Sequence, residues 1–137
     1  MRDDPRADPR IAQALKEFEL DGYAPDPPVN IKSDNSEIMD FLNESEIEYQ
    51  KIFAEWFKEE IIPDNVQTFK TDINGVDGNI INLTISKPKE IDYQIPAILH
   101  IHGGGMTFLT ADDPNYVVWR NTLASKGLFV VGVEFRN

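Results

Sequence analysis

The chain has 137 residues, of which 41% are hydrophobic, and a formal net charge of −11 at pH 7. A chain of this length fits one ordinary domain with its own core, and the negative charge argues against nucleic acid or an anionic membrane as the main partner. The absence of cysteine excludes disulfides and thiolate chemistry.

Two further features concern the surroundings in which the chain works. No stretch reaches the roughly 18 consecutive apolar residues of a membrane span, and the charged, proline-containing first ten residues are unlike a signal peptide. We therefore expect a cytoplasmic protein without a membrane span. Most of the negative charge falls in residues 1–60, which predicts a solvated helical surface; a field that steers a cationic ligand is the alternative.

Residues 1–62 have the pattern of helices. Asp8 and Pro9 are a good pair for the N-cap and first position of a helix, and Gly22 is expected to end that helix. The proline-rich residues 24–30 then predict an extended connector. We expect residues 1–62 to form a helical, cap-like N-terminal segment.

A second helix is expected to start at Asp34 and a third at Ser45, because Ser45 and Glu48 have the spacing of a capping box. Pro63 would stop the third helix, which carries a wide apolar stripe. The stripe consists of Ile52, Phe53, Trp56 and Phe57. Core packing is the ordinary explanation of such a stripe, and the alternative is that Trp56 and Phe57 also line an acyl-binding cavity.

From residue 63 onward the apolar pattern changes to the period of two that is typical of strands. Residues 66–73 and 79–86 flank an Asn-Gly and an Asp-Gly turn dipeptide, which predicts an antiparallel hairpin. Alternation along the second strand predicts that only one of its faces is buried. The residues expected on the other face are Asn82, Thr84 and Ser86.

A strand–helix–strand unit is expected next. Residues 97–102 form an apolar strand, Asp113 and Pro114 again make an N-cap pair, and residues 128–135 are a continuous apolar run typical of a strand buried on both faces. Such a unit places its two strands in parallel, with a right-handed crossover. The predicted fold class is therefore α/β.

Three consecutive glycines follow the strand at residues 97–102, and three explanations compete for them. A dinucleotide-binding fingerprint requires G-x-G-x-x-G running directly into a helix. Gly103 and Gly105 fit that pattern and Phe108 does not, although Glu134 ends the next strand, where a ribose-binding acid could lie. A tight turn without chemistry is the second explanation. The third is an oxyanion hole, in which backbone N–H groups stabilise the negative charge that acyl transfer builds on a carbonyl oxygen.

The motif His102-Gly103-Gly104-Gly105, between an apolar strand and a crossover that ends in VVGVEFRN, resembles the HGGG loop of the hormone-sensitive-lipase-like branch of the α/β-hydrolases. Within that branch, HGGGMT and EFRN look most like the brefeldin A esterase subgroup. The resemblance implies a partial α/β-hydrolase fold. Residues 1–62 would be the helical cap segment and residues 63–137 the N-terminal part of the core, with the sheet incomplete after its fourth strand.

For the site, the resemblance implies a carboxylic-ester hydrolase that works through a serine acyl-enzyme on a small-molecule ester. The N–H groups of Gly104 and Gly105 would face the substrate carbonyl oxygen. Gly103 would permit the turn, and His102 would support the loop by hydrogen bonding, while His100 is expected to be a core residue. No cofactor and no metal are implied. The candidate pocket-lining residues are Met106, Phe108, Leu109, Trp56 and Phe57, and many members have glycine where this chain has Leu109.

The catalytic triad of such an enzyme is not found in these 137 residues. None of the five serines lies in a G-x-S-x-G elbow and both histidines precede Gly103, so we expect this chain alone to be inactive. The family's strand order would leave residues 97–102 as an apolar edge, which predicts self-association through that strand. The alternative function is a non-catalytic, truncated hydrolase-like protein or binding module.

Overall fold

The computed structural model describes residues 4–22 and 26–136. The chain divides into two compact units, Met1–Phe41 and Leu42–Asn137, and each is described by itself. The boundary expected between residues 62 and 63 stays a prediction. None of the helices in the described residues has the length and apolarity that crossing a bilayer requires.

The first helix, α1 (Pro9–Lys16), begins as predicted. The carboxylate of Asp8 accepts a hydrogen bond from the N–H of Arg10, which satisfies one of the free donors of the first turn. The prediction that Gly22 ends the helix is wrong, because a Schellman motif ends it earlier. Glu19 has a φ of 59°, and the N–H of Leu20 donates to the carbonyl of Leu15.

The connector predicted at residues 24–30 lies partly outside the described residues. Residues 26–30, which are described, have no regular secondary structure, as predicted for a proline-rich stretch. The prediction for residues 24 and 25 lies outside the described part of the chain.

The second helix, α2 (Asn35–Trp56), is a single helix of 22 residues. Its start is confirmed at Asp34, whose carboxylate accepts from the N–H of Glu37 at 2.9 Å while the Glu37 carboxylate accepts from the N–H of Asp34 at 3.1 Å. This reciprocal pair is the true capping box. The predicted helix start at Ser45 is wrong, because no glycine or proline interrupts the helix there and its backbone hydrogen bonds continue.

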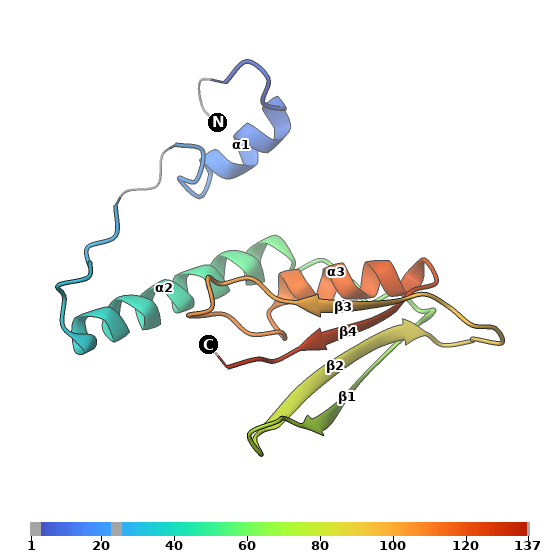
Figure 1. The fold of residues 1–137 in the computed structure, drawn as a ribbon. Coiled ribbons are helices and arrows are strands. Elements are labelled where there is room, and N and C mark those ends of the chain that lie inside the picture. Colours follow the sequence, from blue (N-terminus) through green and yellow to red (C-terminus); the bar gives the residue numbers. More distant parts are fainter. Residues whose placement is uncertain (1–3, 23–25, 137) are drawn as a thin grey trace. The chain divides into compact units, whose positions relative to one another are not determined.

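The second unit contains a four-stranded sheet with the strand order β1-β2-β4-β3 (Figure 1). The strands are β1 (Val66–Asn74), β2 (Ile80–Pro88), β3 (Ala97–Ile101) and β4 (Phe129–Val133), and the helix between the last two is α3 (Pro114–Ser125). β1 and β2 form the predicted antiparallel hairpin, and β3 pairs with β4 in parallel. The sheet is mixed and open, and it agrees with the predicted partial α/β-hydrolase fold.

One face of this sheet packs against α3, and this face carries polar side chains. Thr84 and Ser86 are 7% and 1% exposed, as buried as the apolar Ile85 at 9%. The prediction that only one face of β2 is buried is therefore wrong. Ser86 and Thr68 both donate their hydroxyls to Oδ1 of Asn121 on α3, so hydrogen bonds to the helix satisfy the polar groups as they leave water.

The prediction that β4 is buried on both faces is also only half right. Val130 and Gly132 are buried beneath α3, whereas Phe129, Val131 and Val133 on the other face are only partly covered. A continuous apolar run thus marks a strand whose second face has no covering element among the described residues.

Candidate active-site loop

The candidate site is the loop of residues 102–113, which joins β3 to α3. Gly104 and Gly105 have positive φ angles of 117° and 64°. A Cβ atom on Gly104 would collide with the carbonyl oxygen of Phe108, and one on Gly103 would lie 2.8 Å from the hydroxyl of Tyr116. The loop therefore brings backbone against backbone at a distance that only glycine permits at Gly104.

The carbonyl oxygen of Gly104 closes the turn. It accepts the N–H groups of Thr107 and Phe108 at 3.1 and 3.3 Å and the hydroxyl of Thr107 at 3.0 Å. Among the described residues, no protein acceptor receives a hydrogen bond from the N–H of Gly104 or Gly105. The carbonyl oxygen of Gly104 therefore holds the turn, and the N–H groups of Gly104 and Gly105 are available to another acceptor.

His102 supports the start of the loop from inside the protein. Its side chain is fully buried, its Nδ1 lies 2.8 Å from the carbonyl oxygen of Gly103, and its ring stacks on Phe135 with centroids 4.2 Å apart. A carbonyl oxygen can only accept, so Nδ1 carries the proton of this hydrogen bond. The supporting role of His102 stays a prediction, which this contact favours.

The end of the loop is held through Ala111. Its N–H donates to Oε2 of Glu134 at 2.7 Å, and its carbonyl accepts from Nη2 of Arg120 at 2.7 Å. Just before it, Leu109 is 5% exposed and has a φ of 69°, a conformation that costs a residue with a side chain about 1–2 kcal/mol. Packing around this loop therefore fixes a backbone conformation that the sequence does not favour.

Arg120 and Glu134 were not identified as site-supporting residues from the sequence. An arginine within a helix ordinarily predicts a solvated side chain, yet Arg120 is fully buried. The signal that could have revealed it is Gly132, because a glycine within an apolar strand often marks close approach of another group. A Cβ atom on Gly132 would lie 2.8 Å from Cζ of Arg120.

His100 contacts Arg120 on the same side of the sheet. Its Nδ1 lies 3.3 Å from Nη1 of Arg120, and its ring packs beside Tyr116 and Trp119, with centroids 5.4 and 4.8 Å away. Burial, followed by the charges of Arg120 and His102, lowers the pKa of His100 from its ordinary value. His100 thus packs within the structure and does not reach the glycine loop through any hydrogen bond found in the described residues.

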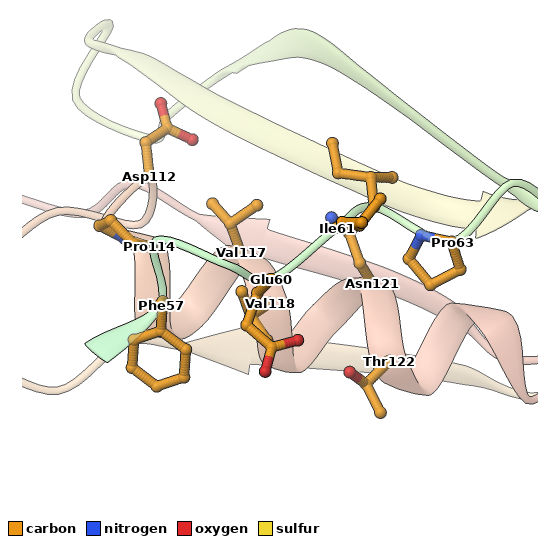
Figure 2. A pocket seen from close by; sticks show the side chains of 11 residues that line it. Phe57, Glu60, Ile61, Pro63, Asp112, Pro114, Val117, Val118, Asn121 and Thr122 are labelled. Carbon is orange, nitrogen blue, oxygen red and sulfur yellow. The ribbon is translucent and has the colours of Figure 1, made fainter. Parts of the chain in front are cut away.

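Figure 2 shows a pocket between α3 and the segment of residues 57–63. This open pocket has a volume of about 290 Å³, and mostly apolar side chains line it, including Phe57, Ile61 and Val117. Of the five candidate pocket residues, only Phe57 lines it.

The structure does not bring the other candidate pocket residues into that pocket. The ring of Phe108 packs against Tyr49 of α2, with centroids 5.5 Å apart. Met106 and Trp56 are 77% and 38% exposed. Their role in binding stays a prediction. In the described part of the chain, no group of three or more histidine, aspartate and glutamate side chains is arranged to hold a metal ion.

Known proteins similar to this chain are esterases. Brefeldin A esterase, described as a bacterial homologue of human hormone-sensitive lipase, is 35% identical, with a TM-score of 0.84 over 99% of this chain and 38% of its own. Esterase Est22 is 27% identical, with a TM-score of 0.75 over 99% of this chain and 39% of its own. Gut esterase 1 of Caenorhabditis briggsae is 29% identical over 56 residues, which are 41% of this chain and 10% of that protein. No family model matches the chain.

The chain spans less than two fifths of the length of these two solved structures. Over nearly all of its own length, however, it shares both their fold and a substantial part of the sequence. In fold, the chain matches a segment of the α/β-hydrolase fold, and in fold and sequence it is similar to hormone-sensitive-lipase-like esterases.

Proposed function

We propose that the chain supplies the oxyanion hole of a carboxylic-ester hydrolase. The observation that carries this proposal is the pair of N–H groups on Gly104 and Gly105, which donate to no acceptor among the described residues while the carbonyl of Gly104 holds the turn. Acyl transfer places negative charge on the carbonyl oxygen of the ester, and preorganised N–H donors stabilise that charge. The similarity to esterases supports the same chemistry.

The rest of the mechanism is proposed for a complete enzyme. A serine would attack the ester carbon and form an acyl-enzyme, which water would then release. Within these 137 residues no serine lies in a G-x-S-x-G elbow and no histidine follows the glycines. We therefore expect this chain alone to bind an oxyanion but not to turn over an ester.

The substrate is proposed to be a small-molecule carboxylic ester. Met106 and Phe108 lie on the same loop as the two donors, and Leu109 packs at its end, so these side chains are proposed to border the acyl group. Trp56 and Phe57 are proposed to line the cavity from the helical side. The proposal for Phe57 is supported by its place in the pocket beside α3.

Butyrate is a suitable probe, because it carries the negative oxygen and short acyl chain of an ester product. We expect titration of the ¹⁵N-labelled 137-residue chain with butyrate to shift the amide resonances of Gly104 and Gly105, and the neutral butyramide to leave them in place. Gly104→Ala should abolish the shifts, since its Cβ collides with the backbone at Phe108. Gly78→Ala is the matched control, because Gly78 also has a positive φ, of 81°, but lies in the hairpin turn.

An esterase assay completes this test. With p-nitrophenyl butyrate, the chain should give no turnover above buffer. Turnover that is abolished by a serine-directed phosphonate would contradict the prediction that these 137 residues lack the catalytic triad. Amide shifts elsewhere in the chain, with none at Gly104 and Gly105, would contradict the oxyanion hole and favour the alternative of a non-catalytic binding module.

A further inference from the structure

Glu134, the residue directly after β4, contacts both ends of the glycine loop with one carboxylate. Its Oε2 accepts the N–H of Ala111 at 2.7 Å, and its Oε1 lies 3.7 Å from Nε2 of His102. His102 directly precedes the three glycines, and Ala111 follows the turn that they form. The carboxylate therefore accepts a hydrogen bond from the residue near the far end of the loop and lies beside the residue at which the loop begins.

Glu134 itself is held by the sheet. Its N–H donates to the carbonyl of Asn82 at 2.9 Å, which extends the pairing of β4 with β2. The next residue, Phe135, stacks on the ring of His102 with an interplanar angle of 16°. The carboxylate thus projects from the end of a paired strand, and a group held on a rigid element positions its partners more accurately than one held on a loop.

Among the described residues, Glu134 is the acceptor for the N–H of Ala111, whereas the hydrogen bond of His102 does not involve Glu134. Nδ1 of His102 is engaged by the carbonyl of Gly103, and Nε2 is buried and makes no hydrogen bond within the described residues. Ala111 is 2% exposed, so solvent cannot readily replace the carboxylate at its N–H. Removal of the Glu134 carboxylate would leave a buried donor unpaired, which is more costly than the loss of an exposed hydrogen bond.

We infer that Glu134 is a positioning residue: its hydrogen bond from Ala111, here called the clasp, fastens the far end of the glycine loop to the end of β4 and so keeps the peptide groups of the loop in one conformation. The consequence for oxyanion binding rests on the proposed function, whereas the clasp itself does not. Glu134 touches no reacting atom in this scheme. It acts through Ala111, whose carbonyl Arg120 holds as well.

The clasp is tested first in the unmodified 137-residue chain. A hydrogen bond from Ala111 to Glu134 gives a scalar coupling across it, which a long-range HNCO spectrum detects as a correlation between the Ala111 amide and the side-chain carboxyl carbon of Glu134. We expect this correlation. If the Ala111 amide is well resolved and this correlation is absent, the inference is overturned. That result does not depend on whether any variant folds.

Two variants of the same length then separate the clasp from simple packing. In Glu134→Gln the side-chain oxygen can still accept the N–H of Ala111. In Glu134→Met this hydrogen bond is lost while the length of the side chain is kept. We expect the Ala111 amide to exchange with solvent at least about tenfold faster in the Met variant and within about twofold of wild type in the Gln variant.

The resonances of Gly104 and Gly105 report the conformation of the loop in the same samples. They should broaden or shift in E134M and stay in place in E134Q, while amide protection in β2 and β4 shows that the sheet is intact. Unchanged exchange at Ala111 in E134M would overturn the inference. Equal losses in the two variants would overturn it as well, because the charge of Glu134 and not its hydrogen bond would then be responsible.

Butyrate titration distinguishes this inference from the proposed function. If the clasp is confirmed but butyrate shifts neither glycine amide in wild type, the positioning role stands and the oxyanion hole fails. If butyrate shifts both amides equally in wild type and E134M, the oxyanion hole stands and the clasp fails. We expect shifts in wild type and E134Q, and a markedly weaker response in E134M.

Discussion

Arg120 is fully buried, and the sheet accommodates it because the residue beneath its guanidinium is Gly132. Burial lowers the pKa of Arg120, while the charges of Asp112 and Glu134 act in the opposite direction. The guanidinium nevertheless stays protonated, so the structure must compensate a buried cation. It does so with the carbonyl of Ala111 and the two nearby carboxylates.

The first prediction concerns the close approach of the Arg120 guanidinium to Gly132. Gly132→Ala places a methyl group 2.8 Å from Cζ of Arg120, and we expect it to lower the free energy of unfolding by about 1–3 kcal/mol. In an Arg120→Met background the flexible methionine can move aside, so the same change should cost less. Urea unfolding of the four chains in this double-mutant cycle should give a coupling of about 1 kcal/mol or more. Additive effects would show that Gly132 is not required by the guanidinium.

A second prediction at this scale concerns pH. The pKa of His100 is lowered in the folded chain, first by burial and then by the charges of Arg120 and His102. The unfolded chain therefore binds this proton at a higher pH than the folded chain does. Protonation of His100 therefore lowers the free energy of unfolding as the pH falls below about 6.5. Above that pH, the contribution of His100 is constant.

The measurement is urea unfolding between about pH 7.5 and pH 5.5, where histidine titrates, with His100→Gln as the comparison. Wild type should lose more stability than the variant across this range. Burial tends to raise the pKa of Asp112, but hydrogen bonds from Lys70 and Thr84 outweigh it and leave that pKa below its ordinary value. Asp112 therefore stays ionised throughout the window. Parallel pH profiles for the two chains would contradict the prediction.

At the scale of elements, the start of α2 gives a direct test of which residues cap it. Asp34→Ala removes one half of the observed capping box and should destabilise the first turn of the helix by about 0.5–2 kcal/mol. Ser45→Ala is the matched control, because Ser45 lies inside the helix, where alanine has the better propensity.

Cα chemical shifts and amide exchange of residues 35–39 report the first turn. They should change in the Asp34 variant and stay as in wild type in the Ser45 variant. A loss of helical shifts centred on residues 45–49 in the Ser45 variant would instead restore the sequence-based expectation of two helices.

These elements also show which parts of the fold the sequence predicts. Turn dipeptides and a period of two predicted the hairpin correctly, and an apolar run on each side of a helix that begins at an N-cap pair predicted the parallel pair, because these signals are local. A capping-box spacing at Ser45 misled because the same residues are tolerated within a helix. The burial of Thr84 and Ser86 was not predictable from alternation, since it depends on the acceptors that Asp112 provides for Thr84 and Asn121 provides for Ser86.

The candidate site likewise contains residues that the sequence predicted and residues that it did not. The glycines are recognisable because their spacing is a local motif, and the positive φ angles of Gly104 and Gly105 agree with the need for glycine. Glu134 and Arg120 approach the loop only through the fold, more than twenty residues and nine residues from Ala111 along the chain. Their side chains gave no local signal of this role.

At the scale of the four-stranded unit, the two faces of the sheet differ in chemistry. The face beneath α3 holds a polar network, whereas the opposite face is mostly apolar and carries Gln67, Thr71 and Lys87 on the hairpin. Alternation along the paired strands assigns to this opposite face Phe69, Leu83, Ile85, Leu99, Ile101, Val131 and Val133. Leu99 and Ile101 on β3 are each 66% exposed, and β3 pairs only with β4 among the described residues.

We propose that the chain associates with a second copy through the edge formed by β3. An apolar edge strand with unpaired backbone groups is a template for pairing, and burial of Leu99 and Ile101 would add a hydrophobic contribution. Sedimentation velocity over a range of concentrations should therefore show a concentration-dependent increase in mass. Leu99→Lys and Ile101→Lys should weaken association at least about tenfold, because a charge would be buried at the contact.

Val76→Lys is the control, because Val76 is a fully exposed apolar residue in the hairpin turn, away from β3, and it should leave association unchanged. Amide exchange adds an independent measure. The amides of residues 97–102 on the free edge should exchange quickly in a dilute monomer and slowly in the assembly, since pairing gives them acceptors. A monodisperse monomer in which these amides are already protected would show that the edge is satisfied within one chain, and self-association would then have no physical basis.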